Sequence, residues 1–141
     1  MRMSSKSTLV QRIIAVGVSA VVLGGCQWLT GPDEVLGFVT GVEAPDTVAV
    51  GTEFSVTVLT SGPTTCWKKD RTVVAVDGLA ADIWPYDVDE SARHPHNLCF
   101  NGVVEIVHST TLSFDQVGAA QVKVHGREGT GAAVLVVIES P

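Results

Sequence analysis

The sequence has 141 residues, of which 45% are hydrophobic and 17% are charged, and its formal net charge is −6. This length fits one domain with a single core. An acidic chain is repelled by phosphate backbones, so the charge excludes nucleic acid as an expected partner.

The N-terminal segment has the layout of a secretory signal. Three basic residues (Arg2, Lys6 and Arg12) precede an apolar run from Ile13 to Leu23. A basic segment, a short apolar segment and a small-residue exit are the parts of a signal peptide. As a helix the apolar run would rise only about 16 Å, roughly half of a bilayer's hydrocarbon core, which disfavours a stable spanning helix.

The end of this segment, Leu23-Gly24-Gly25-Cys26, resembles the lipobox of bacterial lipoproteins. The resemblance implies that residues 1–25 are a cleaved signal peptide and that Cys26 becomes the first mature residue, with its lipid (palmitate) as membrane anchor. It implies residence in the bacterial cell envelope. Gln27 rather than Asp follows the cysteine, which by the sorting rule of Gram-negative lipoproteins favours the outer membrane, on its periplasmic or surface face. An ordinary cleaved signal with a chance cysteine is the alternative.

Residues 26–34 form a polar, turn-rich tether. Fully extended, it reaches at most about 30 Å, so the domain should stay close to the membrane surface. Trp28 and Leu29 either rest in the membrane interface or pack under the domain. The part of the chain from Cys26 onward keeps six basic residues against all fifteen acidic ones, a net charge of −9.

The other two cysteines, Cys66 and Cys99, are an even pair in an oxidising setting and predict one disulfide. A redox-active or metal-binding thiol pair is the alternative, but the Cys-x-x-Cys spacing typical of such pairs is missing.

Residues 35–141 read as short strands separated by turns. Val, Thr, Phe and Ile are frequent, several runs alternate in polarity, and Asp77-Gly78 between two apolar runs predicts a hairpin. Ala132 to Ile138 is apolar without alternation, which predicts a strand covered on both faces or a central strand of the sandwich. A buried helix is the alternative, but seven residues are few for one, and the β-branched residues disfavour it. The expected strands are Leu36–Val42, Thr47–Val50, Phe54–Val58, Arg71–Val76, Leu79–Trp84, Val103–Val107, Thr111–Phe114, Ala120–His125 and Ala132–Ile138.

The predicted fold is therefore all-β, an antiparallel sandwich of about seven to nine strands. The run from Gly41 to Val56 resembles the opening of bacterial immunoglobulin-like domains, in which a first strand crosses between sheets at a proline, here Pro45. No specific characterised family is indicated. Cys66 falls after the Phe54 strand rather than within it, so we expect a bridge that staples a loop, not a core disulfide between sheets.

Residues 85–98 lose the strand pattern and are expected to form a long polar loop. Loops of that length are often functional, and this one concentrates aromatic and charged residues. The candidate binding residues are Trp84, Tyr86, Glu90 and Arg93. The alternative for the aromatic residues, with Trp67, is that they pack over the disulfide and seal one end of the sandwich.

The same loop contains the only cluster of metal-ligand residue types. Zinc could be held by imidazoles and carboxylates, and calcium by the acidic run from Asp87 to Glu90. The candidate ligands are Asp87, Asp89, His94 and His96. A solvated loop without metal, and a protein without any cofactor, is the competing interpretation.

Catalytic motifs are missing from the sequence. There is no Gly-x-Ser-x-Gly elbow and no phosphate-binding glycine loop. His108 and His125 lie at predicted strand ends, where surface or hydrogen-bonding roles are usual. The sequence thus predicts a non-enzymatic, lipid-anchored envelope module that binds or supports another envelope protein or a glycan, with a metal-binding lipoprotein as the alternative.

Overall fold

The computed structural model describes residues 34–92 and 98–139. The predicted signal peptide, Cys26 and the tether before Glu34 lie outside the described residues, as do the candidate ligands His94 and His96 and the candidate binding residue Arg93.

The described residues form nine strands and no helix, which confirms the all-β prediction. The strands are β1 (Glu34–Leu36), β2 (Phe38–Glu43), β3 (Thr47–Ala49), β4 (Phe54–Thr64), β5 (Trp67–Asp77), β6 (Ala80–Asp89), β7 (Asn101–Leu112), β8 (Gly118–Gly126) and β9 (Gly129–Ile138).

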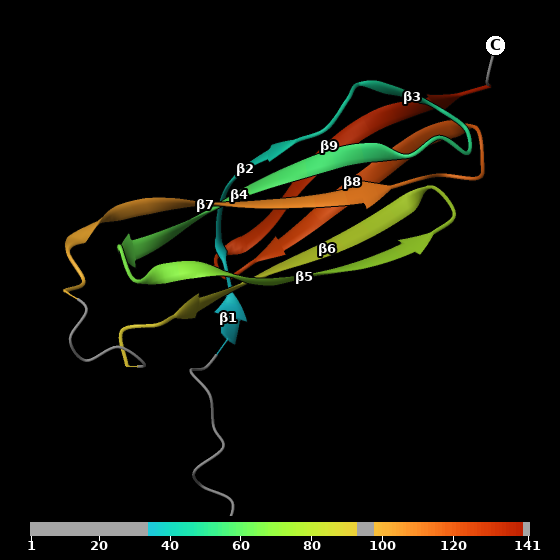
Figure 1. The fold of residues 1–141 in the computed structure, drawn as a ribbon. Helices are drawn as coiled ribbons and strands as arrows, with labels where there is room; N and C mark the ends of the chain where they lie inside the picture. The colour runs from blue at the N-terminus through green and yellow to red at the C-terminus, as the bar shows by residue number, and fades with distance from the viewer. Residues whose placement is uncertain (1–33, 93–97, 140–141) are drawn as a thin grey trace, which may run out of the picture. The chain divides into compact units, whose positions relative to one another are not determined.

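These strands make two sheets that face each other (Figure 1). Sheet B has the order β2-β4-β7. In sheet A, β5 pairs with one edge of β6, while β1 and β8 share the other edge, followed by β9 and β3. The two-layer arrangement is that of a β-sandwich.

Sheet A is mixed, so the prediction of a wholly antiparallel sandwich is wrong. Strand β6 pairs in parallel with β8, and β3 pairs in parallel with β9. The first pairing follows from the connection: between β6 and β8 the chain crosses to sheet B and returns through β7, so β6 and β8 run in the same direction. The predicted hairpin at Asp77-Gly78 is confirmed, with Gly78 at a φ of 58° between β5 and β6.

The N-terminal part of the domain changes sheet twice. Strand β1 belongs to sheet A, β2 to sheet B and β3 to sheet A again, with Pro45 at the second crossing as the sequence predicted. The first crossing, at Gly37, breaks the single strand expected over Leu36–Val42. Gly37 donates its N–H to the carbonyl of Pro85 at 2.8 Å and accepts from the N–H of Arg127 at 3.0 Å.

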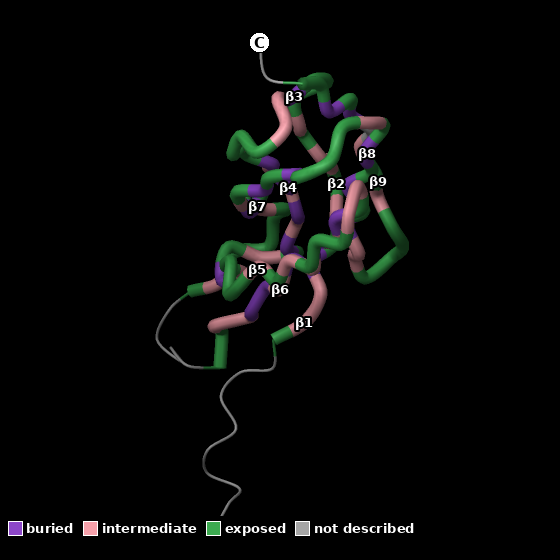
Figure 2. Tube along the Cα trace, turned by 90° about the vertical axis from the view of Figure 1, so that its right-hand side faces the viewer, coloured by how far each residue is buried: buried purple, intermediate pink, exposed green. Residues whose placement is uncertain are grey.

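Alternating side chains from both sheets build the core (Figure 2). Val56 and Val58 on β4 and Val122 and Val124 on β8 are fully buried, which confirms the alternation read from the sequence. The last strand, β9, is central in its sheet, between β8 and β3, which confirms one of the two strand predictions, but it is not buried on both faces. Its Leu135 and Val137 are buried, whereas Val136 and Ile138 are 49% and 44% exposed.

The first five residues of the expected loop over residues 85–98 are strand, because β6 continues to Asp89. Pro85 and Asp87 point into the sandwich and Tyr86 points out, which continues the alternation of the strand. The sequence pattern did not predict this continuation, because a proline and a carboxylate occupy core positions where apolar residues are expected.

The predicted disulfide between Cys66 and Cys99 is confirmed, with a Cα–Cα distance of 5.4 Å. Cys66 lies in the two-residue turn between β4 and β5, and Cys99 precedes β7. Hydrogen bonds from Glu90 N–H to the Cys66 carbonyl (3.1 Å) and from Thr65 N–H to the Phe100 carbonyl (3.2 Å) tie the same segments. We call this part of the sandwich the disulfide end, and the opposite part, with the β5–β6 turn, the far end.

Candidate functional site

Two of the four candidate binding residues, Trp84 and Tyr86, lie on the outer face of sheet A rather than in a loop. They alternate along β6 with the buried residues Ile83 and Pro85, so they share one face of the strand with Asp82. A strand holds side chains more firmly than a loop does, and the site is correspondingly preformed.

Trp84 is held by a neighbour from β8. The parallel register places Ile83 opposite Val124, so the next residues on the two strands, Trp84 and His125, are side by side. Their rings stack, with centroids 4.9 Å apart and planes 12° from parallel. His125 Nε2 lies 2.6 Å from Asp82 Oδ1. The predicted hydrogen-bonding role of His125 is thus confirmed.

Tyr86 is covered by a cation from β5. The Arg71 guanidinium lies 4.3 Å from the Tyr86 ring centroid. The same guanidinium donates to both carboxylate oxygens of Glu34, at 2.7 and 2.5 Å. This hydrogen-bonded pair, with a smaller contribution from Asp70, lowers the pKa of Glu34 from 4.5 to about 2 and raises the pKa of Arg71.

We call this surface the outer aromatic face, defined by Glu34, Arg71, Asp82, Trp84, Tyr86 and His125. It offers ring surface, both signs of charge and hydrogen-bonding groups on a sheet. Trp, Tyr and Arg are the residue types that dominate binding energy at protein interfaces. The arrangement suits recognition of a partner's surface rather than enclosure of a small substrate.

Trp67 lies apart from this face, near the disulfide. It is half-buried, a Cβ on Gly62 would overlap its side chain, and the Arg127 guanidinium lies 5.2 Å from its ring centroid. The prediction that the aromatic residues pack at the disulfide end is therefore correct for Trp67. It is wrong for Trp84 and Tyr86, which lie on the outer face of sheet A.

A second polar group lies inside the sandwich. His108 Nε2 is 2.8 Å from Asp87 Oδ1, and His108 Nδ1 is 2.9 Å from Thr72 Oγ1. The His108 and Asp87 side chains have no exposed surface. Hydrogen bonding, one of the two roles expected for His108, is confirmed, although His108 lies within β7 rather than at a strand end. The expectation of a loop carboxylate at Asp87 is wrong, because Asp87 lies on β6. On β7, His108 occupies the same face as the buried Ile106 and Leu112, and this alternation was the available signal.

A hydroxyl, an imidazole and a carboxylate in series are also the parts of a nucleophilic triad. Here Asp87 and His108 are sealed from solvent, and Thr72 is on the core-facing side of β5. Asp87 Oδ2 is buried without a hydrogen-bond partner, against the backbone of Gly37. The group joins β5, β6 and β7 across the two sheets, which is a structural role.

Of the four predicted metal ligands, the structure describes Asp87 and Asp89, and each of these has a hydrogen-bond partner within the protein. Asp87 is enclosed and bonded to His108, while Asp89 Oδ1 accepts from the Ser91 N–H at 2.9 Å. Glu90, a candidate binding residue, forms an ion pair with Lys68 at 2.7 Å. Within residues 34–92 and 98–139, no group of three or more His, Cys, Asp or Glu side chains is arranged to hold a metal ion.

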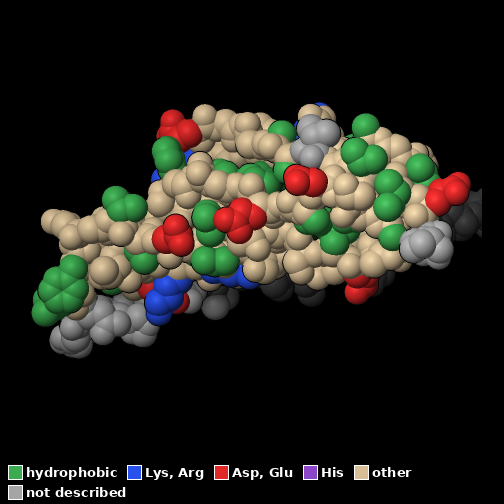
Figure 3. All heavy atoms as spheres, turned by 90° about the horizontal axis from the view of Figure 1, so that it is seen from above, with side chains coloured by type: hydrophobic (Ala, Val, Ile, Leu, Met, Phe, Trp, Pro, Cys, Tyr) green, Lys and Arg blue, Asp and Glu red, His purple; other side chains and the backbone are tan. Residues whose placement is uncertain are grey.

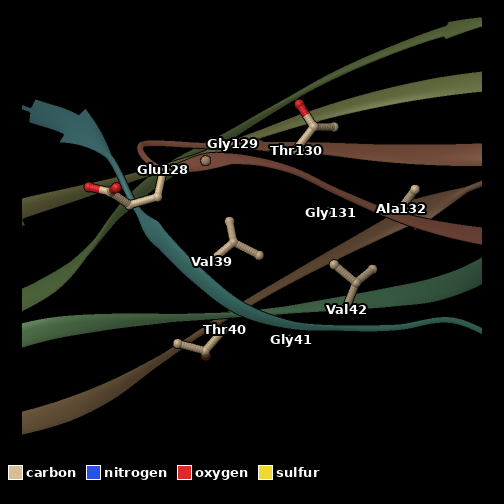
Figure 4. Close-up of a pocket in the computed structure, with 10 residues that line it drawn as sticks. Val39, Thr40, Gly41, Val42, Glu128, Gly129, Thr130, Gly131 and Ala132 are labelled. Carbon is tan, nitrogen blue, oxygen red and sulfur yellow. The ribbon is translucent and has the colours of Figure 1, made fainter.

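A groove with a volume of about 360 Å³ lies between β2 and the β8–β9 hairpin (Figure 4). Val39 and Val42 point from β2 toward the hairpin, and Thr40 points away. Four glycines line it together with Ala132, and Glu128 is the charged residue of its lining. The groove therefore offers aliphatic and backbone contacts and no catalytic group.

The part of the chain that the structure describes contains no helix of the length and hydrophobicity needed to cross a bilayer. Comparison with protein-family models, with curated proteins and with solved structures finds no match to this chain.

Proposed function

We propose that this protein is a lipid-anchored, non-enzymatic module of the bacterial envelope that binds another envelope protein through the outer aromatic face. The proposed fold type is an immunoglobulin-like sandwich. The sheet change at Pro45 supports this fold type. The pairing of β6 rather than β5 with β8 departs from the usual strand order of immunoglobulin-like domains. The proposed anchor is the lipid on Cys26, in the outer membrane of a Gram-negative cell.

The observation that carries the proposal is the paired state of the aromatic residues on β6. Trp84 is stacked on His125, and Tyr86 is covered by Arg71, which Glu34 holds from a second strand. Ordering these side chains in advance reduces the entropy lost when a partner binds. A flat, preformed surface with Trp, Tyr and Arg fits a protein partner better than a small molecule.

The anchor is tested with Cys26→Ser. Removing the thiol removes the lipid acceptor, so we expect the variant to leave the detergent phase that holds the wild-type protein. Membrane fractionation of the wild type should place it with the outer membrane. An unchanged detergent distribution of the variant would overturn the lipoprotein assignment.

The binding face is tested by cross-linking in intact cells, comparing wild type with Trp84→Ala and Arg71→Ala. Each substitution should reduce the cross-linked partner at least about tenfold, as expected for a hot-spot residue. Val107→Ala is the matched control, since Val107 is 51% exposed on the outer face of sheet B. Equal loss in all three variants, or in none, would contradict the assignment of the outer aromatic face.

A further inference from the structure

The most exposed large hydrophobic side chains of the described residues gather at the disulfide end. Val103 is 84% exposed, Leu98 is 79% exposed and Phe100 is 64% exposed. We call these three residues the apolar tip. Figure 3 shows hydrophobic side chains protruding at that end of the molecule. Apolar surface concentrated in this way marks a site of contact with a protein or a membrane.

The apolar tip is held in place by its surroundings. Cys99, between Leu98 and Phe100, is bonded to Cys66. Phe100 N–H donates to Thr65 Oγ1 at 3.1 Å, and the Phe100 carbonyl accepts from the Thr65 N–H at 3.2 Å. The segment is thus fixed with its side chains outward.

The chain enters the domain at this same end. Glu34, the first described residue, is opposite Val88 near the end of β6, and Val88 is in turn opposite Lys68, two residues after Cys66. From Cys26 to Glu34 the chain spans at most about 28 Å. A lipid on Cys26 therefore keeps the disulfide end near the bilayer.

The charge distribution points the same way. Lys68, Lys69 and Arg71 lie at the start of β5, at the disulfide end, with Asp70 between Lys69 and Arg71. The nearby carboxylates of Glu90 and Glu34 are paired with Lys68 and Arg71. The exposed acidic residues of the far end, by contrast, lie in or beside turns that contain no Lys or Arg: Glu53, Asp77, Asp115 and Glu139. A bilayer with anionic lipids therefore repels the far end more than the disulfide end, where basic side chains offset the carboxylates.

We propose that the disulfide end faces the bilayer and that the apolar tip inserts at the boundary between lipid headgroups and acyl chains. This inference rests on the lipid anchor of the proposed function and adds a second contact to it. The occupant of the apolar tip is the lipid surface itself, because the entry point of the chain and the exposed hydrophobic residues coincide there and the turns with acidic but no basic residues lie at the opposite end.

The test uses the full, lipidated chain in vesicles of phosphatidylethanolamine and phosphatidylglycerol whose acyl chains carry bromine near the headgroup. Bromine quenches the fluorescence of a nearby indole. The indole introduced by Phe100→Trp should be quenched at least twofold, after subtraction of the native tryptophan signal. Val117→Trp is the matched control, since Val117 is 52% exposed at the far end, and its added indole should not be quenched.

The two proposals fail in different ways. A protein that does not float with the vesicles overturns the anchor and this inference together. A protein that floats, with neither added indole quenched or with both quenched equally, overturns the inference alone. Hydrogen exchange of the unsubstituted chain gives a second measurement: amides of residues 98–104 should exchange several-fold more slowly on vesicles than in detergent-free solution, and those of residues 113–118 should not change. Unchanged exchange in both segments would also overturn the inference.

Discussion

His108 on β7 and Asp87 on β6 form a 2.8 Å contact between the two sheets, and neither side chain has any exposed surface. Burying such a pair requires the partner groups to compensate the loss of water, and His108 completes this with Thr72 at 2.9 Å. Asp87 leaves its Oδ2 without a hydrogen bond. The contact therefore makes the fold sensitive to the loss of either partner.

His108→Ala should destabilise the domain by about 3–5 kcal/mol, because it leaves the Asp87 carboxylate buried without its partner. The free energy of unfolding is measured by denaturant titration of the oxidised protein. Ser109→Ala, at the exposed neighbouring position of β7, should change it by less than about 0.5 kcal/mol.

The double variant Asp87→Leu with His108→Phe separates the cost of a broken pair from the worth of the pair itself. With neither of these polar side chains left in the core, it should be more stable than His108→Ala alone. If the double variant lost as much free energy of unfolding as Asp87→Leu and His108→Phe lose together as single variants, the contact would carry no coupling energy.

Gly37→Ala should also be destabilising, because of what surrounds the glycine. An added Cβ would lie 2.5 Å from both Asp87 Oδ2 and Thr60 Cγ2, two buried side chains with no room to move. We expect a loss of about 1–3 kcal/mol, typical of overpacking. Gly102→Ala is the matched control, since nothing lies within 4 Å of the Cβ it would add. Equal thermal stability of the two variants would contradict the tight crossing at Gly37.

The sequence predicts local features of this fold well and long-range ones poorly. Alternation identified Val56, Val58, Val122 and Val124 as core residues, and Asp77-Gly78 marked its hairpin, because each depends on neighbours in the chain. The pairing of β6 with β8 depends on a crossing through the other sheet, for which no local signal exists.

The candidate site shows the same division. Trp84 and Tyr86 were candidates from the sequence, but their partners His125 and Arg71 come from other strands. The sequence predicts a metal site at Asp87 because this residue lies among other His, Asp and Glu residues in a segment that loses the strand pattern. Its burial became evident only once His108, distant in the sequence, was seen to pair with it.

Reduction of the Cys66–Cys99 disulfide should lower stability without removing the strand structure. The bridge closes a sequence separation of 33 residues at one end of the sandwich, outside the main core cluster. Chain-entropy arguments give a loss of about 3–4 kcal/mol, and a domain of this size then melts roughly 10–20 °C lower. Circular dichroism with and without reductant measures the melting temperature and shows whether the strand signal is retained. Mass spectrometry after alkylation should find no free Cys66 or Cys99 thiol in the oxidised protein. Two alkylated thiols would contradict the bridge.

The ion pair between Glu34 and Arg71 makes a prediction about pH. The hydrogen bonds from Arg71 lower the pKa of the Glu34 carboxyl to about 2, below its ordinary value of 4.5. A carboxyl with a lowered pKa in the folded state contributes stability above its unfolded pKa and loses that contribution as the pH falls toward the folded pKa. The contribution of Glu34 should therefore be complete above about pH 5 and disappear between pH 4.5 and about 2. Solvent screens this exposed pair, so the effect on total stability should be small.

The titration itself is the sharper measurement. Carboxyl NMR of the wild type should follow Glu34 to a midpoint near pH 2, and Arg71→Gln should return the midpoint toward 4.5. Arg127→Gln is a suitable control, because Arg127 is bonded to the Leu36 carbonyl rather than to Glu34. The same Arg71→Gln spectra should show the Tyr86 ring signals shifting, since Arg71 covers that ring. A Glu34 midpoint that is near 4.5 in the wild type, or that does not respond to Arg71→Gln, would contradict the pair and the ordered state of this side of the outer aromatic face.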